Sequence, residues 1–190
     1  MKIETLEIAG FRSVLEALRL PFNKEARSVT RFNLSEESTV GAERRGQWAW
    51  WLSAETSVCA DPRDLRLMET LVRRGDEHAK AVRGIVVYAK ITAPVYWWCE
   101  LETYRAGHER LSSESTMHGV AKGLTGDELV RVKSELPMGT ELAKVDMFSY
   151  QALRRIAVQR RGHRLPEWAE FIAWMRSLPL SRELIFAGMD

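Results

Sequence analysis

Cysteine is scarce in this sequence, which has only Cys59 and Cys99 among its 190 residues. Two cysteines in a chain of this length do not build a disulfide framework. Neither has a histidine at the spacing of a zinc motif. We therefore expect both to be reduced thiols in or near the core, and we expect no metal site.

Long apolar runs are also missing. No run approaches the ~18 residues that a membrane span needs, and Met1 is not followed by the apolar core of a signal peptide. The net charge is only +2, which gives no strong signal for nucleic acid but allows a local basic site. We expect a cytoplasmic protein that does not enter a membrane.

Several catalytic and nucleotide-binding motifs are absent. The sequence has no Walker loop and no Gly-x-Gly-x-x-Gly fingerprint, so a classical nucleotide fold is not supported. It has no Gly-x-Ser-x-Gly elbow, so an α/β-hydrolase is not supported either.

What is present fits one globular domain over residues 1–190, with 45% hydrophobic and 28% charged residues. Alternating apolar residues and a β-branched run predict strands, and apolar residues at helical spacing predict helices. The predicted strands cover residues 2–8 and 85–91, and the predicted helices cover 13–18, 61–75, 95–104, 127–136, 148–159 and 166–178. Residues 23–46 read as irregular, and the tryptophans at 48, 50 and 51 allow no assignment. The pattern indicates an α+β fold with a modest sheet.

A polar segment follows the buried run Gly84–Trp98. It extends from Tyr104 to His118 and contains arginine, histidine, glutamate and hydroxyl side chains. Donors gathered at the exit of a buried element are typical of an anion or nucleotide site.

Two interpretations of the basic residues stay open. Five arginines gather near the end of the helix predicted at 148–159, where cations complement the helix dipole: Arg154, Arg155, Arg160, Arg161 and Arg164. Alternatively, Arg105 and Arg110 join Arg160 around an anion, because guanidinium forks match phosphate oxygens.

The other polar and aromatic groups are equally open. The run from Ser112 to Ser115 is either part of a ligand site or a helix cap. His108 and His118 are possible ligand donors, whereas His78 and His163 suit the surface or a position that supports a ligand-binding residue. Trp97 and Trp98 either stack on a flat ring or fill the core.

With its segments in this order, the chain resembles the flavin-dependent thymidylate synthase (ThyX) family. That family has Arg-His-Arg, seven residues and then Ser. The same order here is Arg105-Ala106-Gly107, seven residues and then Ser115, and Ser112–Thr116 stands at the family's Asn-Glu-x-Ser portion. Further along, Leu136-Pro137 precedes a helix in which Arg160 falls at the position of the family's nucleotide-binding arginine.

The chain also departs from the family pattern. Ala106 and Gly107 replace the His-Arg that contacts the flavin in the family. Met117 stands where the family has a phosphate-binding arginine, and Ser149 replaces a leading Asn. With these differences, the chain resembles a divergent member of the family, of a kind found in phage or mobile-element genomes.

The resemblance implies a small antiparallel sheet flanked by helices, a homotetramer, and binding of FAD, NADPH, methylenetetrahydrofolate and a dUMP-like pyrimidine nucleotide. It implies methylation or hydroxymethylation at C5 of the base. On this basis Arg160 and Ser115 are the candidate catalytic residues, and Arg105 and His108 are candidates for cofactor binding. The candidate substrate-binding residues are Arg105, Arg110, Ser113, Glu114, Ser115 and Arg160. A second hypothesis is a non-catalytic protein of the same fold that binds a nucleotide or serves in an assembly.

Overall fold

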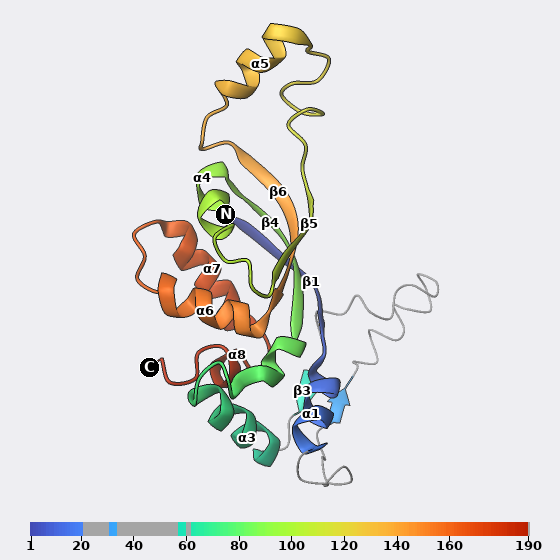
Figure 1. The fold of residues 1–190 in the computed structure, drawn as a ribbon, viewed down its shortest axis with the longest axis vertical. Helices are drawn as coiled ribbons and strands as arrows, with labels where there is room; N and C mark the ends of the chain where they lie inside the picture. The colour runs from blue at the N-terminus through green and yellow to red at the C-terminus, as the bar shows by residue number, and fades with distance from the viewer. Residues whose placement is uncertain (21–30, 34–56, 60–61, 190) are drawn as a thin grey trace, which may run out of the picture.

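The computed structural model describes residues 1–20, 31–33, 57–59 and 62–189. Its centre is a four-stranded antiparallel sheet in the order β1-β4-β6-β5 (Figure 1). These strands are β1 (Lys2–Ala9), β4 (Val86–Pro94), β6 (Glu141–Ser149) and β5 (His108–Ser113). A separate antiparallel pair joins β2 (Arg31–Asn33) to β3 (Ser57–Cys59). The predicted α+β class with a small antiparallel sheet is confirmed.

The helices connect and cover this sheet. In chain order they are α1 (Phe11–Arg19), α3 (Pro62–Arg73), the 3-10 helix η3 (Ala79–Gly84), α4 (Val95–Leu101), α5 (Gly126–Ser134), α6 (Tyr150–Arg160), α7 (Pro166–Ser177) and α8 (Ser181–Leu184). None of the helices in the described ranges is both long and apolar enough to cross a membrane.

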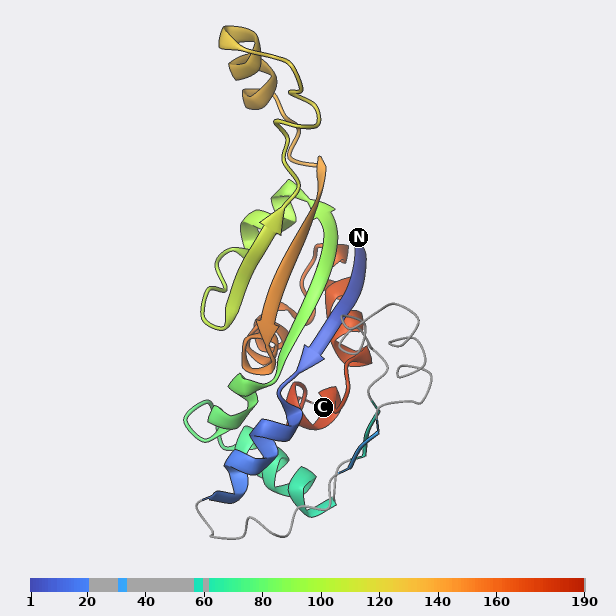
Figure 2. The same ribbon diagram turned by 90° about the vertical axis from the view of Figure 1, so that its right-hand side faces the viewer.

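The sheet has one covered face. Helices α6 and α7 lie against it, and no described helix crosses the opposite face (Figures 1 and 2). In β4 the alternate residues Val87, Ala89, Ile91 and Ala93 are fully buried on the covered side, as the two-residue period of a strand requires. The central position predicted for this strand is confirmed.

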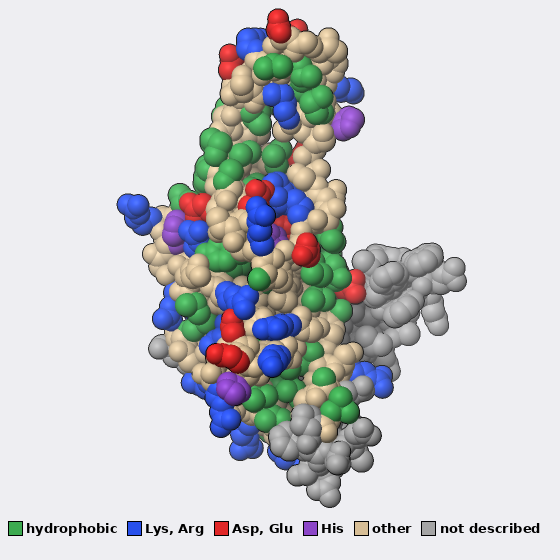
Figure 3. All heavy atoms as spheres, in the orientation of Figure 1, with side chains coloured by type: hydrophobic (Ala, Val, Ile, Leu, Met, Phe, Trp, Pro, Cys, Tyr) green, Lys and Arg blue, Asp and Glu red, His purple; other side chains and the backbone are tan. Residues whose placement is uncertain are grey.

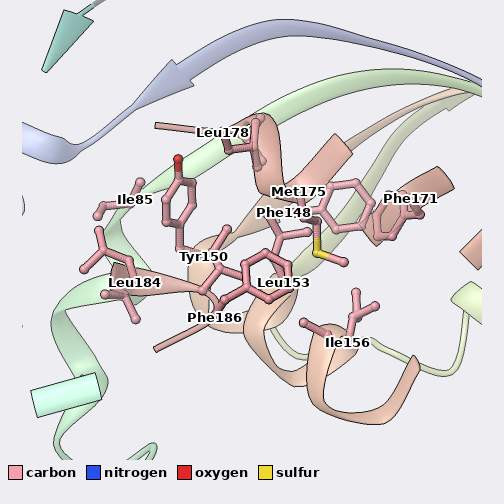
Figure 4. Close-up of a cluster of buried hydrophobic side chains, with 14 of the residues drawn as sticks. Ile85, Phe148, Tyr150, Leu153, Ile156, Phe171, Met175, Leu178, Leu184 and Phe186 are labelled. Atoms are coloured by element: carbon pink, nitrogen blue, oxygen red, sulfur yellow. The ribbon is translucent and has the colours of Figure 1, made fainter. Parts of the chain in front are cut away.

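The core lies between the sheet and the helices. Phe148 from β6, Leu153 and Ile156 from α6, and Phe171 and Met175 from α7 pack together (Figure 4). Trp97, Trp98 and Trp168 are among the largest buried side chains, and the ring centroids of Trp97 and Trp168 are 5.1 Å apart. Of the two interpretations of the tryptophan pair at 97–98, the one in which both rings fill the core is therefore confirmed.

Residues 114–140 form an arm that projects beyond the end of the sheet, with α5 at its tip (Figures 1 and 2). No residue of α5 is buried. The arm places Ser115, Met117 and His118 outside the packed body of the protein.

Several sequence predictions need correction. The helix predicted at 95–104 ends at Leu101, and the helix predicted from Phe148 begins at Tyr150 because Phe148 still belongs to β6. The region expected to be irregular contains β2. Cys99 is exposed rather than near the core, because it lies on the outer side of α4.

The helix-cap interpretation of Ser112–Ser115 is also wrong. Ser112 and Ser113 belong to strand β5, which pairs with β6. The next helix, α5, has Thr125 at its N-cap position. Ser115 instead precedes a turn, and its carbonyl oxygen accepts hydrogen bonds from the amides of His118 and Gly119.

Candidate functional site

The polar segment begins in a turn between α4 and β5 and creates a pocket of about 280 Å³. We call it the loop pocket; its lining residues are Glu102, Arg105, His108 and Arg110. Two of the three candidate arginines, Arg105 and Arg110, are thus brought together with His108. The pocket opens on the face of the molecule on which Lys and Arg side chains gather with Asp and Glu side chains (Figure 3).

His108 is the fixed wall of the loop pocket. The residue is 8% exposed, and its ring stacks on Phe148 with centroids 4.5 Å apart and an interplanar angle of 5°. Nε2 lies 2.9 Å from Oδ2 of the fully buried Asp146, and Nδ1 lies 3.0 Å from the carbonyl oxygen of Tyr104. With both ring nitrogens engaged inside the protein, His108 supports the pocket more than it offers a free donor.

Arg110 ties the pocket to the sheet. Its Nε donates to Oδ1 of Asp146 at 3.2 Å, and its Nη1 donates to Glu102. Burial acts to lower the pKa of Arg110, but the hydrogen bonds to Asp146 and Glu102 outweigh it and raise the pKa. The hydrogen bond from Arg110 lowers the pKa of Glu102. Asp146 therefore has two partners from β5, the guanidinium of Arg110 and the imidazole of His108.

Lys144 completes this ionic cluster. Its Nζ lies 3.5 Å from Glu102 and 4.6 Å from the ring centroid of Trp98. Burial, followed by the nearby positive charge of Arg110, lowers the pKa of Lys144. The cluster places three cationic or potentially cationic side chains around two carboxylates.

Ser113 and Glu114 line a different pocket, of about 410 Å³, at the β5–β6 edge of the sheet. Glu114 is held in place there: its amide donates to the carbonyl oxygen of Ala143 at 2.7 Å, and its Oε2 accepts from the amide of Ala143 at 3.0 Å. We call this the edge pocket; its lining residues are Lys90, Ser112, Ser113, Glu114, Ala143, Lys144 and Val145.

Arg160 belongs to a separate network behind the loop pocket. Its Nε donates to the hydroxyl of Tyr104 at 2.7 Å, and its Nη1 donates to Oε2 of Glu100 at 2.7 Å. The guanidinium lies over the ring of Trp168, 4.6 Å from the centroid, and Trp168 Nε1 donates to the same Glu100 oxygen at 2.8 Å. Arg160 is therefore linked to the loop pocket through Tyr104, whose hydroxyl contacts Arg160 and whose carbonyl oxygen contacts His108.

Three other arginines of the cluster contact different elements instead of forming one solvated helix face, and Arg164 is exposed. Arg154 donates to the carbonyl oxygens of Ile185 and Ala187, both at 2.9 Å. Burial lowers the pKa of Arg154. Arg155 pairs with Asp76, and Arg161 donates to the carbonyl of the penultimate residue. These contacts fasten α6 to the segments on either side of it.

A third pocket, of about 420 Å³, lies where the N-terminus of α6 meets the start of β5. We call it the α6 pocket; its lining residues are Arg83, Val86, Ala106, Gly107, Met147, Ser149, Gln151 and Arg155. It contains both positions at which the signature lacks His-Arg, and it contains Ser149, which caps α6 by accepting from the amide of Ala152 at 3.1 Å. Sequence reasoning did not select Arg83 or Gln151, because they lie on elements far from the polar segment.

The structure thus divides the predicted site residues among two pockets, the Arg160 network and the arm. Arg105, His108 and Arg110 share the loop pocket, and Ser113 and Glu114 share the edge pocket. Arg160 connects to the first through Tyr104. Ser115 lies at the base of the arm and is exposed.

This arrangement defines an antiparallel sheet with helices on one face and polar pockets where β5 meets the turns that flank it. No protein-family model matches the sequence, and a search of curated proteins finds no match. Solved structures do match over almost the whole chain. A flavin-dependent thymidylate synthase ThyX from Helicobacter pylori, complexed with FAD and dUMP, has a TM-score of 0.61 at 11% identity and covers 98% of each chain.

A second match is a UMP/dUMP methylase, PolB, from Streptomyces cacaoi bound with 5-Br dUMP. It has a TM-score of 0.56 at 11% identity and covers 98% of this chain and 94% of that one. The chain therefore has the fold of the flavin-dependent thymidylate synthases. The resemblance in the order of segments is confirmed at the level of the fold, and the low identity is consistent with a divergent member.

Proposed function

We propose that the protein modifies a pyrimidine deoxynucleotide at C5, by methylation or hydroxymethylation, with a flavin and a folate as cofactors. One observation carries the proposal: the whole chain shares its fold with a thymidylate synthase complexed with FAD and dUMP and with a dUMP methylase. The loop pocket supports the proposal as well, because Arg105 and Arg110 in its lining are suitable partners for an anionic ligand.

Whether a flavin fits this chain depends on Ala106 and Gly107, the two positions where the family has its flavin-contacting His-Arg. Ala106 offers no polar group, and a Cβ at Gly107 would lie 2.4 Å from Oγ of Ser149, so an arginine side chain at 107 would displace the start of α6. An open pocket nevertheless remains beside both residues. The positions therefore fit a cofactor held without side chains at 106 and 107: Arg105, the remaining cation of the triplet, would donate to it, and the fixed ring of His108 would support it as a wall of the loop pocket.

A bound flavin reduced by NADPH would supply the reducing equivalents, and methylenetetrahydrofolate would supply the one-carbon unit. The protein's own part is electrostatic. Guanidinium groups of Arg105 and Arg160 would stabilise negative charge that develops on the pyrimidine ring, since preorganised cations act most strongly where charge forms. Ser113, Glu114 and Ser115 would orient the nucleotide by hydrogen bonds. We further propose that the chain assembles as a homotetramer.

The alternative function is nucleotide binding without catalysis. The loss of polar side chains at Ala106, Gly107 and Met117 favours it. Both functions predict that the protein binds dUMP, but only the first predicts that it converts dUMP to a product.

Flavin binding and turnover separate the two. Purified protein is titrated with FAD, followed by flavin fluorescence, and then incubated with dUMP, methylenetetrahydrofolate and NADPH. A product heavier by a methyl or hydroxymethyl group in mass spectrometry supports catalysis, whereas dUMP binding without flavin binding or product supports the alternative. Arg105→Gln should weaken dUMP or FAD binding, while Arg164→Gln, a change at an exposed arginine, should not. Light scattering that finds only a monomer would contradict the tetramer.

A further inference from the structure

The α6 pocket contains a pair of arginines that none of the roles above uses. Arg83 comes from η3 and Arg155 from α6, and both line the pocket beside Ala106 and Gly107. We infer that this pocket binds the phosphate groups of a ligand and that Arg83 and Arg155 are the residues that bind them. The inference rests on the proposed function, because that function supplies the two candidate ligands that carry a phosphate, a nucleotide and a flavin.

Each guanidinium is fixed by its Nε atom. Arg83 Nε donates to Oε1 of Gln151 at 2.6 Å, and Arg155 Nε donates to Oδ2 of Asp76 at 2.6 Å. Among the described residues, none accepts a hydrogen bond from the Nη atoms of either arginine. A guanidinium held along one edge still presents its two Nη donors as a fork, the geometry that matches two oxygens of a phosphate.

The supports of the two arginines are connected to each other. Gln151 is 3% exposed, and its Nε2 donates to the carbonyl oxygen of Asp76 at 3.3 Å. One continuous chain of hydrogen bonds therefore runs from Arg83 through Gln151 and Asp76 to Arg155. A buried amide that orients a cation toward a pocket preorganises that cation for a ligand.

The charges in the α6 pocket do not balance. Asp76 is the carboxylate in this chain of hydrogen bonds, and it contacts Arg155. Within the part of the chain that the structure describes, the guanidinium of Arg83 therefore has only the neutral amide of Gln151 as a side-chain partner. The Asp76–Arg155 pair is also partly exposed, at 41% and 36% of the side-chain surface. Figure 3 shows basic and acidic side chains gathered over α6 and the turn that precedes β4. An excess cation at an open pocket is the electrostatic requirement of an anion site.

The floor of the pocket suits the close approach of an anion. Ala106 and Gly107 present backbone and one methyl group, and Gly107 has φ +80. The signature segment therefore supplies no cation here, and the neighbouring η3 and α6 supply two. The pocket therefore keeps its positive charge through Arg83 and Arg155, although positions 106 and 107 carry no cation.

Binding measurements test the inference on the full chain. Isothermal titration with pyrophosphate, dUMP and FAD is carried out on the wild type, Arg83→Gln, Arg155→Gln and Arg155→Lys. Arg164→Gln is the matched control, since it removes the same charge from an exposed arginine outside the pocket. Thermal unfolding of each variant is measured in parallel, because Arg155→Gln also breaks the contact with Asp76.

We expect Arg83→Gln and Arg155→Gln each to weaken pyrophosphate binding tenfold or more, Arg155→Lys to weaken it less, and Arg164→Gln to leave it unchanged. The ligand whose affinity falls with the same variants, dUMP or FAD, is the source of the phosphate. Unchanged pyrophosphate affinity in folded Arg83→Gln, or no pyrophosphate binding by the wild type, overturns the inference.

The inference and the proposed function fail separately. FAD and dUMP binding that is insensitive to both arginines overturns the inference and leaves the proposed function in place. Pyrophosphate binding that depends on the arginines, in a protein that binds neither FAD nor dUMP, overturns the proposed function and supports a different phosphate-bearing ligand.

Discussion

Gly107 lies so close to Ser149 that a Cβ at position 107 would come within 2.4 Å of the serine hydroxyl oxygen. The amide of Ser149 also donates to the carbonyl oxygen of Gly107 at 2.7 Å. The start of β5 is thereby pressed against the start of α6. Any side chain at 107 would move that junction and the α6 pocket with it.

Gly107→Ala should destabilise the protein by about 2–4 kcal/mol, because it adds a steric clash to the roughly 1 kcal/mol cost of a positive φ for alanine. Gly123→Ala is the matched control: Gly123 has φ +79, but no atom would lie within 4 Å of a Cβ added there, so only the backbone cost should appear. Urea denaturation gives both free energies of unfolding. Equal losses in the two variants would show that the contact with Ser149 relaxes without cost.

Asp146→Asn should cost about 3–5 kcal/mol, because it removes the fully buried charge that His108 and Arg110 share and leaves Arg110 with only the half-exposed Glu102 as an ionic partner among the described residues. The measurement is again the free energy of unfolding. Glu135→Gln breaks the exposed pair between Glu135 and Arg131 and should cost no more than about 0.5 kcal/mol. A loss of that small size at Asp146 would mean that the cluster does not hold β5 to β6.

Glu102 should make stability depend on acidic pH. Its pKa is lowered below 4.5 in the folded protein by Arg110, so its contribution is fully present above pH 4.5 and is lost as pH falls through the lowered value. The half-exposed side chain makes this contribution small. The stability difference between the wild type and Glu102→Gln should therefore be constant at neutral pH, shrink in acid and decrease with added salt. A difference that grows in acid would reverse the sign of the interaction.

The parts of the fold with a strong local signal could be predicted from the sequence. Apolar alternation marks β1, the β-branched run marks β4, and Pro62 and Pro166 open α3 and α7. The shared order of segments around Arg105 and Arg160 predicted the fold. Each of these signals is carried by residues close together in the chain.

Strands β5 and β6 could not be predicted in the same way. Strand β5 is polar and mostly exposed, and β6 buries Asp146, a charge that only its partners on β5 make acceptable there. The arginine pair at 83 and 155 was missed for the same reason. Pairings between distant segments decide these features, and local periodicity does not contain them.

Arg160 has a structural connection to Glu100 and a proposed role in nucleotide binding, and one pair of variants can distinguish the two. Arg160→Gln removes the cation and also its hydrogen bonds to Glu100 and Tyr104, so we expect a loss of about 1–3 kcal/mol in the free energy of unfolding. Glu100→Gln weakens the same connection but leaves the guanidinium in place, and its amide oxygen can still accept from Trp168. If Arg160 binds the nucleotide, dUMP affinity measured by calorimetry should fall at least tenfold in Arg160→Gln, as expected for the loss of a charge-assisted hydrogen bond, and remain near the wild-type value in Glu100→Gln. If the two variants lose stability to the same extent and both keep dUMP affinity, Arg160 serves to hold α6 against α4, and the nucleotide must be bound by the arginines of the pockets instead.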